Sequence, residues 1–232
     1  MKIVVSSGAG MSAESGITTF RDAGGLWENY PVMDVASVEG FARDPALVHH
    51  FYNERRKQLL EAQPNAAHIA LAELEKTHDV HIVTQNVDDL HERAGSTRVL
   101  HLHGELMKVR TMREPYSYYQ LPCDQLSGEG LCTSPETTDR DGLHVRPHIV
   151  FFGEDVPNFQ PACRLAQEAD VFVVIGTTLS VYPAAALLQY TREDTKVFYI
   201  DPKPAAVPEW VNVIAKPATQ GVAEFIEILR TL

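Results

Sequence analysis

Cysteine and long hydrophobic runs are scarce in this chain of 232 residues. The three cysteines, Cys123, Cys132 and Cys163, are too few and too scattered for a disulfide scaffold. No apolar run approaches the roughly 20 residues that a membrane helix needs. The opening segment has neither the basic start nor the long apolar stretch of a signal peptide. We therefore expect a cytoplasmic protein that does not associate with membranes.

Positive charge is scarce as well. The chain has 20 Lys and Arg residues against 31 Asp and Glu residues, a formal net charge of -11. Its only basic cluster is the short run Arg55, Arg56 and Lys57. Such a surface repels nucleic acid, so we expect no nucleic-acid partner, whereas lysine-bearing substrates are tolerated. With 44% hydrophobic and 22% charged residues, the composition is that of a globular domain.

Short apolar runs rich in β-branched residues alternate with segments of helical period, which predicts a parallel α/β sheet with helices on both faces. The expected strands are residues 2–6, 80–84, 99–102, 171–175, 196–200 and 211–214. The expected helices are residues 45–61, 65–76, 161–169, 183–190 and 220–232.

Two stretches interrupt this alternation. Residues 108–146 have little periodicity and many turn-forming residues, and so long a loop is uncommon inside a compact domain. Residues 23–62 read as a second, helical insertion. We therefore expect a smaller discontinuous subdomain from residues 23–62 and 108–146. The larger part would comprise residues 1–22, 63–107 and 147–232.

The first strand runs into Gly8-Ala9-Gly10, followed by a helix-forming stretch. This arrangement places a pyrophosphate on backbone N–H groups at a helix N-terminus, because the glycines let the backbone approach closely. Ala13 departs from the usual dinucleotide fingerprint. A glycine-bearing turn without a ligand stays open as the alternative.

Asn86 and Asp88 follow the second strand of the expected sheet, at the carboxyl edge where ligands bind. An amide beside a carboxylate suits a carboxamide ligand, and capping of the next helix is the alternative. His101 and His103 lie two apart on an expected strand and would point the same way. They are either part of a metal site or two polar groups of the core, and no third ligand is near in sequence.

Five blocks of the chain, taken together, resemble the sirtuins, the NAD-consuming protein-lysine deacylases. The blocks are GAGMSAESGITTFR (8–21), TQNVDDLHERAG (84–95), HLHGEL (101–106), PHIVFFGE (147–154) and IGTTLSVYP (175–183). The resemblance spans nearly the whole chain and implies one sirtuin-type catalytic domain, with a Rossmann-like sheet and a smaller subdomain. NAD and an acylated lysine of a protein substrate would meet in the cleft between them.

The resemblance also implies a reaction. The acyl oxygen of the substrate lysine attacks C1′ of the nicotinamide ribose, and nicotinamide leaves. His103 then acts as general base toward a ribose hydroxyl, for which an imidazole is suited because its pKa is near neutral. The products are free lysine, nicotinamide and O-acyl-ADP-ribose, and NAD is a consumed co-substrate.

Residue roles carry over from the matching positions. Asn86 is assigned with His103 to catalysis, and His91 is expected to be structural. The cofactor-binding residues implied are Gly8, Ala9, Gly10, Ser12, Ile17, Phe20, Arg21, Trp27, Gln85, Asn86, Val87, Asp88, Gly176, Thr177, Thr178, Asp201 and Ala218. The substrate-binding residues implied are Tyr52, Arg55, Val150, Phe152, Gly153 and Glu154, of which residues 150–154 resemble a strand that pairs with the substrate peptide.

Tyr52 and Arg55 are three apart and share a helix face. A phenol beside a guanidinium can receive a carboxylate, and a surface tyrosine with a solvated arginine is the alternative. Their spacing matches the Tyr-x-x-Arg pair of the sirtuins that remove succinyl and malonyl groups. We therefore predict desuccinylase and demalonylase activity beside deacetylation.

The match breaks at the structural zinc, which most sirtuins hold with two Cys-x-x-Cys pairs. The first pair has no counterpart here, and Cys123 and Cys132 are too far apart for the second. Cys163 reads as a core thiol. We expect no metal, so residues 108–146 must fold by packing. Candidates for that packing are Tyr116, Tyr118, Tyr119 and Leu121.

Other functions stay open. Mono-ADP-ribosyl transfer or NAD hydrolysis could use the same pocket, and an ADP-ribose-binding module would need no turnover. A dehydrogenase is disfavoured by the Gly-Ala-Gly pattern, which is not the usual dinucleotide fingerprint. We expect a monomer.

Overall fold

The computed structural model of the chain describes residues 1–17, 26–27, 30–128 and 130–232. Its largest feature is a six-stranded sheet in which every pairing is parallel, as predicted. In spatial order the strands are β11 (Asn212–Ile214), β10 (Lys196–Ile200), β9 (Val171–Ile175), β1 (Lys2–Ser7), β4 (Asp79–Thr84) and β5 (Val99–His101). β1 therefore lies at the centre of the sheet, and β5 and β11 form its edges.

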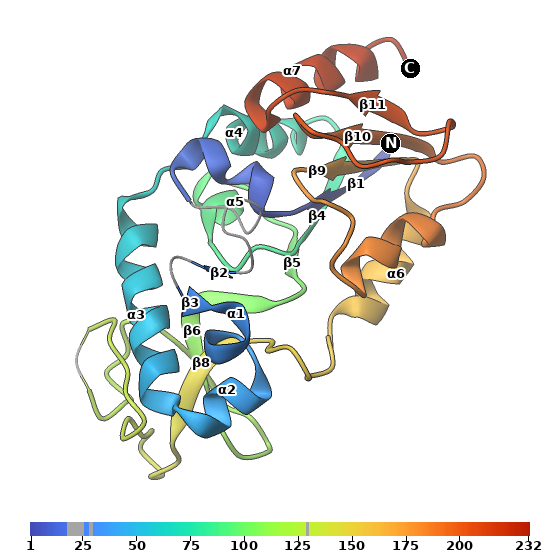
Figure 1. The fold of residues 1–232 in the computed structure, drawn as a ribbon. Coiled ribbons are helices and arrows are strands. Elements are labelled where there is room, and N and C mark those ends of the chain that lie inside the picture. The colour runs from blue at the N-terminus through green and yellow to red at the C-terminus, as the bar shows by residue number, and fades with distance from the viewer. Residues whose placement is uncertain (18–25, 28–29, 129) are drawn as a thin grey trace.

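Side chains of the strands alternate between two apolar cores, one on each face of the sheet. Val171, Val173 and Ile175 of β9 pack under α4 (Ala66–Leu74) and α7 (Ala218–Leu229). Phe172 and Val174 face α6 (Phe159–Glu168) and the 3₁₀ helix η4 (Ala184–Tyr190) on the other side (Figure 1). No helix in the described part of the chain is long and apolar enough to cross a membrane.

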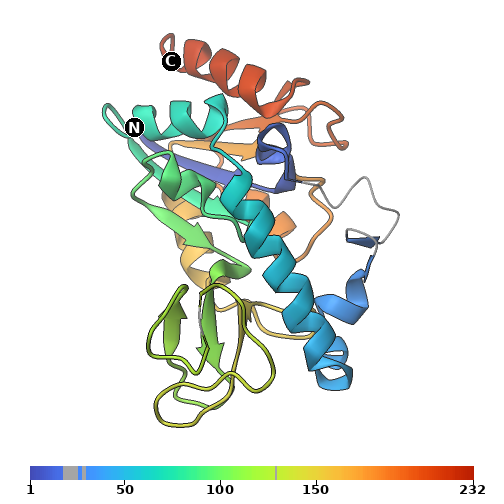
Figure 2. The same cartoon turned by 90° about the vertical axis from the view of Figure 1, so that its left-hand side faces the viewer.

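A second part of the molecule lies beyond the carboxyl ends of these strands (Figure 1). It contains an antiparallel sheet in the order β7–β6–β8, from Tyr118–Gln120, Gly104–Thr111 and Val145–Ile149. The ribbon β2 (Leu26–Trp27) and β3 (Tyr30–Pro31) and the helices α1 (Val32–Val35), α2 (Val38–Arg43) and α3 (Pro45–Glu61) belong to it too. Figure 2 shows α3 extending from the six-stranded part along the antiparallel sheet.

The antiparallel sheet has a small core of its own. Val109, Leu121 and Val145 are buried at its centre, and Tyr119 packs against them. The prediction was right for Leu121 and Tyr119 and wrong for the other two tyrosines. Tyr118 is exposed and its ring meets the His148 ring, and the Arg110 guanidinium lies over the ring of the exposed Tyr116.

A buried arginine fastens α3 to the long connection between β7 and β8. Arg56 is fully buried and donates from Nε to the carbonyl of Leu106 (2.9 Å) and from Nη1 to Asn53 Oδ1 (2.7 Å). Asn53 in turn holds the backbone of Thr133 through two hydrogen bonds, of 3.0 and 2.8 Å. Polar side chains of one helix thus order a segment that has no regular structure.

Two local predictions were wrong. The glycine loop after β1 leads into two three-residue 3₁₀ turns, η1 (Ala9–Met11) and η2 (Ala13–Ser15), and no α-helix begins there in the described residues. Gly16, in the left-handed region at φ +85°, ends the second turn. The segment expected as a helix over residues 183–190 is the 3₁₀ helix η4.

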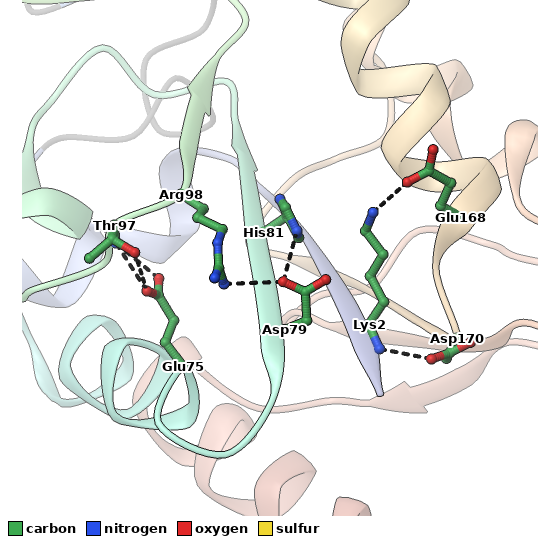
Figure 3. A network of polar contacts seen from close by, with 8 residues as sticks. All are labelled: Lys2, Glu75, Asp79, His81, Thr97, Arg98, Glu168 and Asp170. Atoms are coloured by element: carbon green, nitrogen blue, oxygen red, sulfur yellow. Dashed lines mark hydrogen bonds and ion pairs between the residues drawn. The ribbon is translucent and has the colours of Figure 1, made fainter.

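At the amino ends of the central strands, Figure 3 shows a network of surface ion pairs and hydrogen bonds. Lys2 donates its backbone N–H to Asp170 (2.8 Å) and pairs through Nζ with Glu168. Asp79 receives Arg98 and His81, each at 3.1 Å. The charged groups at this end of the sheet are thus paired with one another at the surface.

Candidate active site

Two glycine turns meet at the carboxyl ends of β1 and β9. Gly8 N–H donates to the carbonyl of Ile175 (2.9 Å), and Gly10 N–H donates to that of Gly176 (2.8 Å). A Cβ on Gly10 would lie 2.7 Å from the Gly176 Cα, and one on Gly176 would lie 2.4 Å from the Met11 nitrogen. Gly176 also has φ +63°. Only glycine fits this close approach, which leaves bare backbone at the edge where a phosphate group would lie.

Beside these turns, three polar side chains form a buried chain of hydrogen bonds. Asn86 Nδ2 donates to Ser12 Oγ (3.1 Å), and the Ser12 hydroxyl donates to Asp88 Oδ2 (2.9 Å). Burial raises the pKa of Asp88, against the opposing effect of hydrogen bonds from the Leu90 N–H and from Ser12. Asp88 accepts that N–H, of the first residue of α5 (Leu90–Arg93), on Oδ1 (3.2 Å). The N-cap residue of α5 is Asp89, whose side chain makes no cap hydrogen bond, so helix capping does not account for Asn86 and Asp88.

His103 is held in one tautomer. It is half-buried, and its Nδ1 lies 3.0 Å from the carbonyl of Gln85. A carbonyl only accepts, so Nδ1 carries the proton and Nε2 keeps a lone pair. Burial lowers the pKa of His103, against a smaller effect of the Gln85 carbonyl. The neutral ring that results is the form that a general base needs.

His101 contacts the backbone of Asn86, the residue after Gln85. The predicted strand was to carry both histidine rings, but β5 ends at His101. Its Nδ1 lies 2.9 Å from the carbonyl of Asn86, and its Nε2 lies 2.8 Å from Glu92 Oε1. Among the described residues no group of three or more His, Cys, Asp and Glu side chains is placed to hold a metal ion. Of the two alternatives for this histidine pair, the geometry favours polar groups that orient the 85–86 backbone.

His91, expected to be structural, is buried behind this site. Its Nε2 lies 3.0 Å from Ser7 Oγ, and its ring meets the His68 ring edge to face at 4.8 Å between centroids. Burial, with the charges of His68 and His101, lowers the pKa of His91 well below its usual value. It is therefore a neutral core group.

The turn after β9 carries the predicted threonines. Thr177 is buried, its Oγ1 accepts from Gln85 Nε2 (3.3 Å), and its carbonyl accepts from the Tyr199 hydroxyl (2.8 Å). Thr178 is hydrogen-bonded to Ser180. Asp201, buried after β10, accepts the N–H of Lys203 on Oδ1 (2.8 Å). These groups lie at the same carboxyl edge as the glycine turns.

Other predicted cofactor residues lie at varied places. Ala9 begins η1, and Ile17 and Val87 pack at the margin of the core between α3 and β6. Ala218 begins α7 and is buried in the core beneath it, so its side chain faces the sheet. Trp27 belongs to β2, whose side chains are not described, and Phe20 and Arg21 lie outside the described residues.

Tyr52 and Arg55 lie one turn apart on α3. Tyr52 is fully buried, stacked on Phe151 with 6.2 Å between ring centroids and edge to face on Phe51. The Arg55 guanidinium lies over the Phe51 ring, 4.8 Å from its centroid. Burial raises the pKa of the Tyr52 phenol, against the opposing charges of Arg146 and Arg56. The tyrosine is therefore enclosed, with Arg146, Arg56 and Glu154 acting on its phenol, and is not a surface residue.

Residues 150–154 do not form the predicted strand. Phe152 N–H donates to the Ala36 carbonyl (2.8 Å) and the Phe152 carbonyl accepts from Val38 N–H (3.1 Å), so this backbone is already paired with the α1–α2 connection. A turn follows, with Gly153 at φ +96°. The chain bends there because the carboxylate at position 154 is drawn inward, where it accepts the Phe151 N–H (2.8 Å).

Glu154 belongs to a charge cluster under this turn. Its carboxylate receives a fork from Arg146 (2.9 and 2.8 Å) and one contact from Arg110 (3.1 Å). Burial alone would raise the pKa of Glu154, but the arginines and the backbone bond lower it. Sequence reasoning did not assign Arg146 or Arg56 to the surroundings of Tyr52. Arg56 stands in a charged run and Arg146 at the end of an irregular stretch, so the sequence carries no signal that either is buried.

The three cysteines lie in different surroundings. Cys123 packs against the small core of the antiparallel sheet, Cys132 is exposed, and all three thiols are free. Cys163 is buried under the six-stranded sheet, as predicted for a core thiol.

The fold and this carboxyl edge define a class, an α/β protein of the dinucleotide-binding kind. The family model described as the Sir2 family matches residues 8–183. An NAD-dependent protein deacylase of Bacteroides thetaiotaomicron is 53% identical over 229 residues, covering 98% of this chain and 97% of the relative. The chain belongs to the Sir2 family.

Solved structures agree with this assignment. The crystal structure of a Sir2 homolog–NAD complex superposes with a TM-score of 0.85 at 36% identity, over 99% of this chain and 90% of that one. A structure described as Sir2–p53 peptide–NAD+ has a TM-score of 0.79 at 29% identity, over 99% of this chain and 94% of that one.

Proposed function

We propose that this chain is an NAD-dependent protein-lysine deacylase that removes succinyl and malonyl groups as well as acetyl groups. The observation that carries the proposal is the placement of His103, a neutral imidazole whose Nδ1–H is fixed on the Gln85 carbonyl (3.0 Å). The buried Asn86–Ser12–Asp88 cluster lies on the adjoining backbone. The 53% identical relative is named an NAD-dependent protein deacylase, and a similar structure is described as a complex of Sir2 with a p53 peptide and NAD+.

The residues at the carboxyl edge fit NAD. Gly8, Gly10 and Gly176 leave no room for a Cβ, which suits the close approach of a pyrophosphate to backbone. Asn86, polarised by Ser12 and Asp88, would hold the nicotinamide carboxamide. Thr177 and Asp201 would meet ribose hydroxyls. When bound, NAD supplies a ribose carbon from which nicotinamide can leave.

His103 would take the proton of a ribose hydroxyl. Its Nε2 is the only basic nitrogen of the ring because Nδ1 donates to a carbonyl. The substrate backbone would pair with residues after Phe152, since the N–H and carbonyl of Phe152 are already paired. The acylated lysine would then reach His103 past the core formed by α3 and Phe151.

Acceptance of acidic acyl groups rests on α3. The Arg55 guanidinium lies over the Phe51 ring, 4.8 Å from its centroid. A carboxylate that met this guanidinium would form a charge-assisted pair. Tyr52 would add a hydroxyl donor one turn away, and Arg146 and Arg56 add positive charge around it.

The experiment compares succinyl-lysine and acetyl-lysine forms of one peptide, with and without NAD, with products followed by mass. We expect NAD-dependent formation of O-succinyl-ADP-ribose and O-acetyl-ADP-ribose. Tyr52→Phe with Arg55→Met should lower kcat/KM for the succinyl peptide by about 10- to 100-fold, the range for charge-assisted hydrogen bonds, and change the acetyl value little.

Lys57→Met is the matched control, because Lys57 is an exposed cation on the same helix. Unchanged succinyl turnover in the Tyr52/Arg55 variant would remove the carboxylate-receptor role. NAD cleavage without deacylation of either peptide would place ADP-ribosyl transfer or NAD hydrolysis ahead of deacylation.

The same proposal covers location and partners. With a net charge of -11, the enzyme would act in the cytoplasm on acylated lysines of proteins, without nucleic acid or membrane as partner. We propose that it acts as a monomer and without a structural zinc. Sedimentation and metal analysis of the purified protein test both points.

A further inference from the structure

We propose that His101 is a positioning residue. Held as an imidazolium between Glu92 and the Asn86 carbonyl, it sets the backbone of the nicotinamide-binding loop and makes NAD affinity depend on pH. This inference rests on the proposed function, because it assigns Asn86 to the nicotinamide.

The geometry requires two donors on one ring. His101 is buried, with 8% of its surface exposed, and each of its nitrogens faces an acceptor. Nδ1 lies 2.9 Å from the Asn86 carbonyl, and Nε2 lies 2.8 Å from Glu92 Oε1. Neither acceptor can donate, so both contacts are hydrogen bonds only when both nitrogens carry protons.

The His101 ring is placed to fix the backbone of Asn86. Asn86 donates its side-chain amide to Ser12 and its backbone N–H to Thr84 Oγ1 (3.0 Å), while His101 secures its carbonyl. All three anchors of Asn86 are hydrogen bonds to different elements. Without the third, the peptide plane between residues 86 and 87 is free to rotate, which moves the side-chain amide.

The charged groups around His101 favour its protonated form. Burial opposes the charge, but the hydrogen bond and charge of Glu92, with the Asn86 carbonyl and Glu105 of β6, raise the pKa of His101. Asp88 faces it from the loop after β4, and His91 of α5 is neutral. Lys108 acts on Glu92 from β6 and lowers the pKa of that carboxyl together with His101.

Deprotonation forces a choice between the two contacts. A neutral ring with its proton on Nδ1 keeps the Asn86 carbonyl but turns a lone pair toward the Glu92 carboxylate. A ring with its proton on Nε2 keeps Glu92 and releases Asn86. NAD affinity should therefore fall as the pH rises through the raised pKa of His101, and be fully present below it.

The Glu92→Gln variant removes the negative charge of this side chain and keeps its shape. The glutamine amide can accept from an imidazolium and, after a flip, donate to a neutral ring, so Nδ1–H stays on Asn86 at every pH. Glu92 has 40% of its side chain exposed, so the variant leaves packing intact. His101→Phe removes both contacts and is the second variant.

The measurement is the Kd of NAD by titration calorimetry on the full chain, between pH 6 and 9, without peptide. We expect wild-type affinity to fall about five- to ten-fold across the range, the loss of one hydrogen bond. Glu92→Gln should bind as wild type does at pH 6 and stay flat. His101→Phe should bind weakly at every pH.

Asp79→Asn is the matched control, since Asp79 receives His81 at the opposite end of the sheet (3.1 Å), and it should keep the wild-type profile. Parallel profiles for wild type and Glu92→Gln would overturn the role of His101 while leaving NAD binding in place. No NAD binding by the wild-type protein at any pH would instead overturn the proposed function.

Discussion

Replacing Gly176 by alanine tests whether the contact between the two glycine turns builds the nucleotide edge. The new Cβ would lie 2.4 Å from the Met11 nitrogen and 2.5 Å from the Gly10 carbonyl carbon, both backbone atoms that cannot swing aside. A φ of +63° costs a side chain about 1–2 kcal/mol, and overpacking adds about 1–3 kcal/mol. We expect the free energy of unfolding to fall by about 2–5 kcal/mol and NAD affinity to fall with it.

Gly142→Ala is the control for this prediction. Gly142 also has positive φ, +77°, but a Cβ there would meet nothing within 4 Å. It should cost only the backbone part, about 1–2 kcal/mol. Urea denaturation measures both variants, and calorimetry measures NAD binding. Equal losses in the two variants, or intact NAD affinity in Gly176→Ala, would refute the argument.

Two further predictions concern histidines. His103→Ala should lower kcat by about 10²- to 10⁴-fold with little change in the Kd of NAD. The control is His50→Ala, at an exposed position on α3, which should leave both values unchanged. Steady-state deacylation measures kcat, and calorimetry measures the Kd. His49 and His68 are buried, and burial is the main cause that lowers the pKa of each to about 4. Between pH 6.5 and 4 the unfolded chain therefore binds more protons than the folded chain. The free energy of unfolding should fall by about 3 kcal/mol per histidine as the pH is lowered through that window. Urea denaturation at several pH values measures this slope, His68→Gln should lessen it by one histidine's share, and an unchanged slope would contradict the assignment.

The parallel sheet was predictable because its strands are short buried runs of β-branched residues whose pattern depends on no partner. Residues 171–175, for example, are apolar throughout and buried on both faces. The 3₁₀ turns after Gly8 were not predictable in this way. The stretch has helix-forming residues, but the Ser12 hydroxyl is drawn to Asp88, 76 residues along the chain. Tertiary contacts there override local propensity.

The same distinction applies to the site. Gly8, Asn86, Asp88 and His103 could be proposed from the sequence because they sit in recognisable blocks at strand ends. His101 was in the same block, yet its role depends on Glu92 and on the carbonyl of Asn86, which only the fold brings together. The strand over residues 150–154 was predicted from the resemblance alone, and only the fold shows that the chain turns at Gly153 and that Glu154 accepts the Phe151 N–H.

The central place of β1 in the sheet has a consequence for how the chain folds. Its residues pair with residues of β4 that come 77 positions later in the chain, as Ser7 does with Thr84. They also pair with β9, and Lys2 contacts Asp170, which is 168 positions away. During synthesis, β1 can gain its second neighbour in the sheet, β9, only after most of the chain has been made. Contacts of such separation slow folding and leave a hydrophobic segment exposed to association in the meantime.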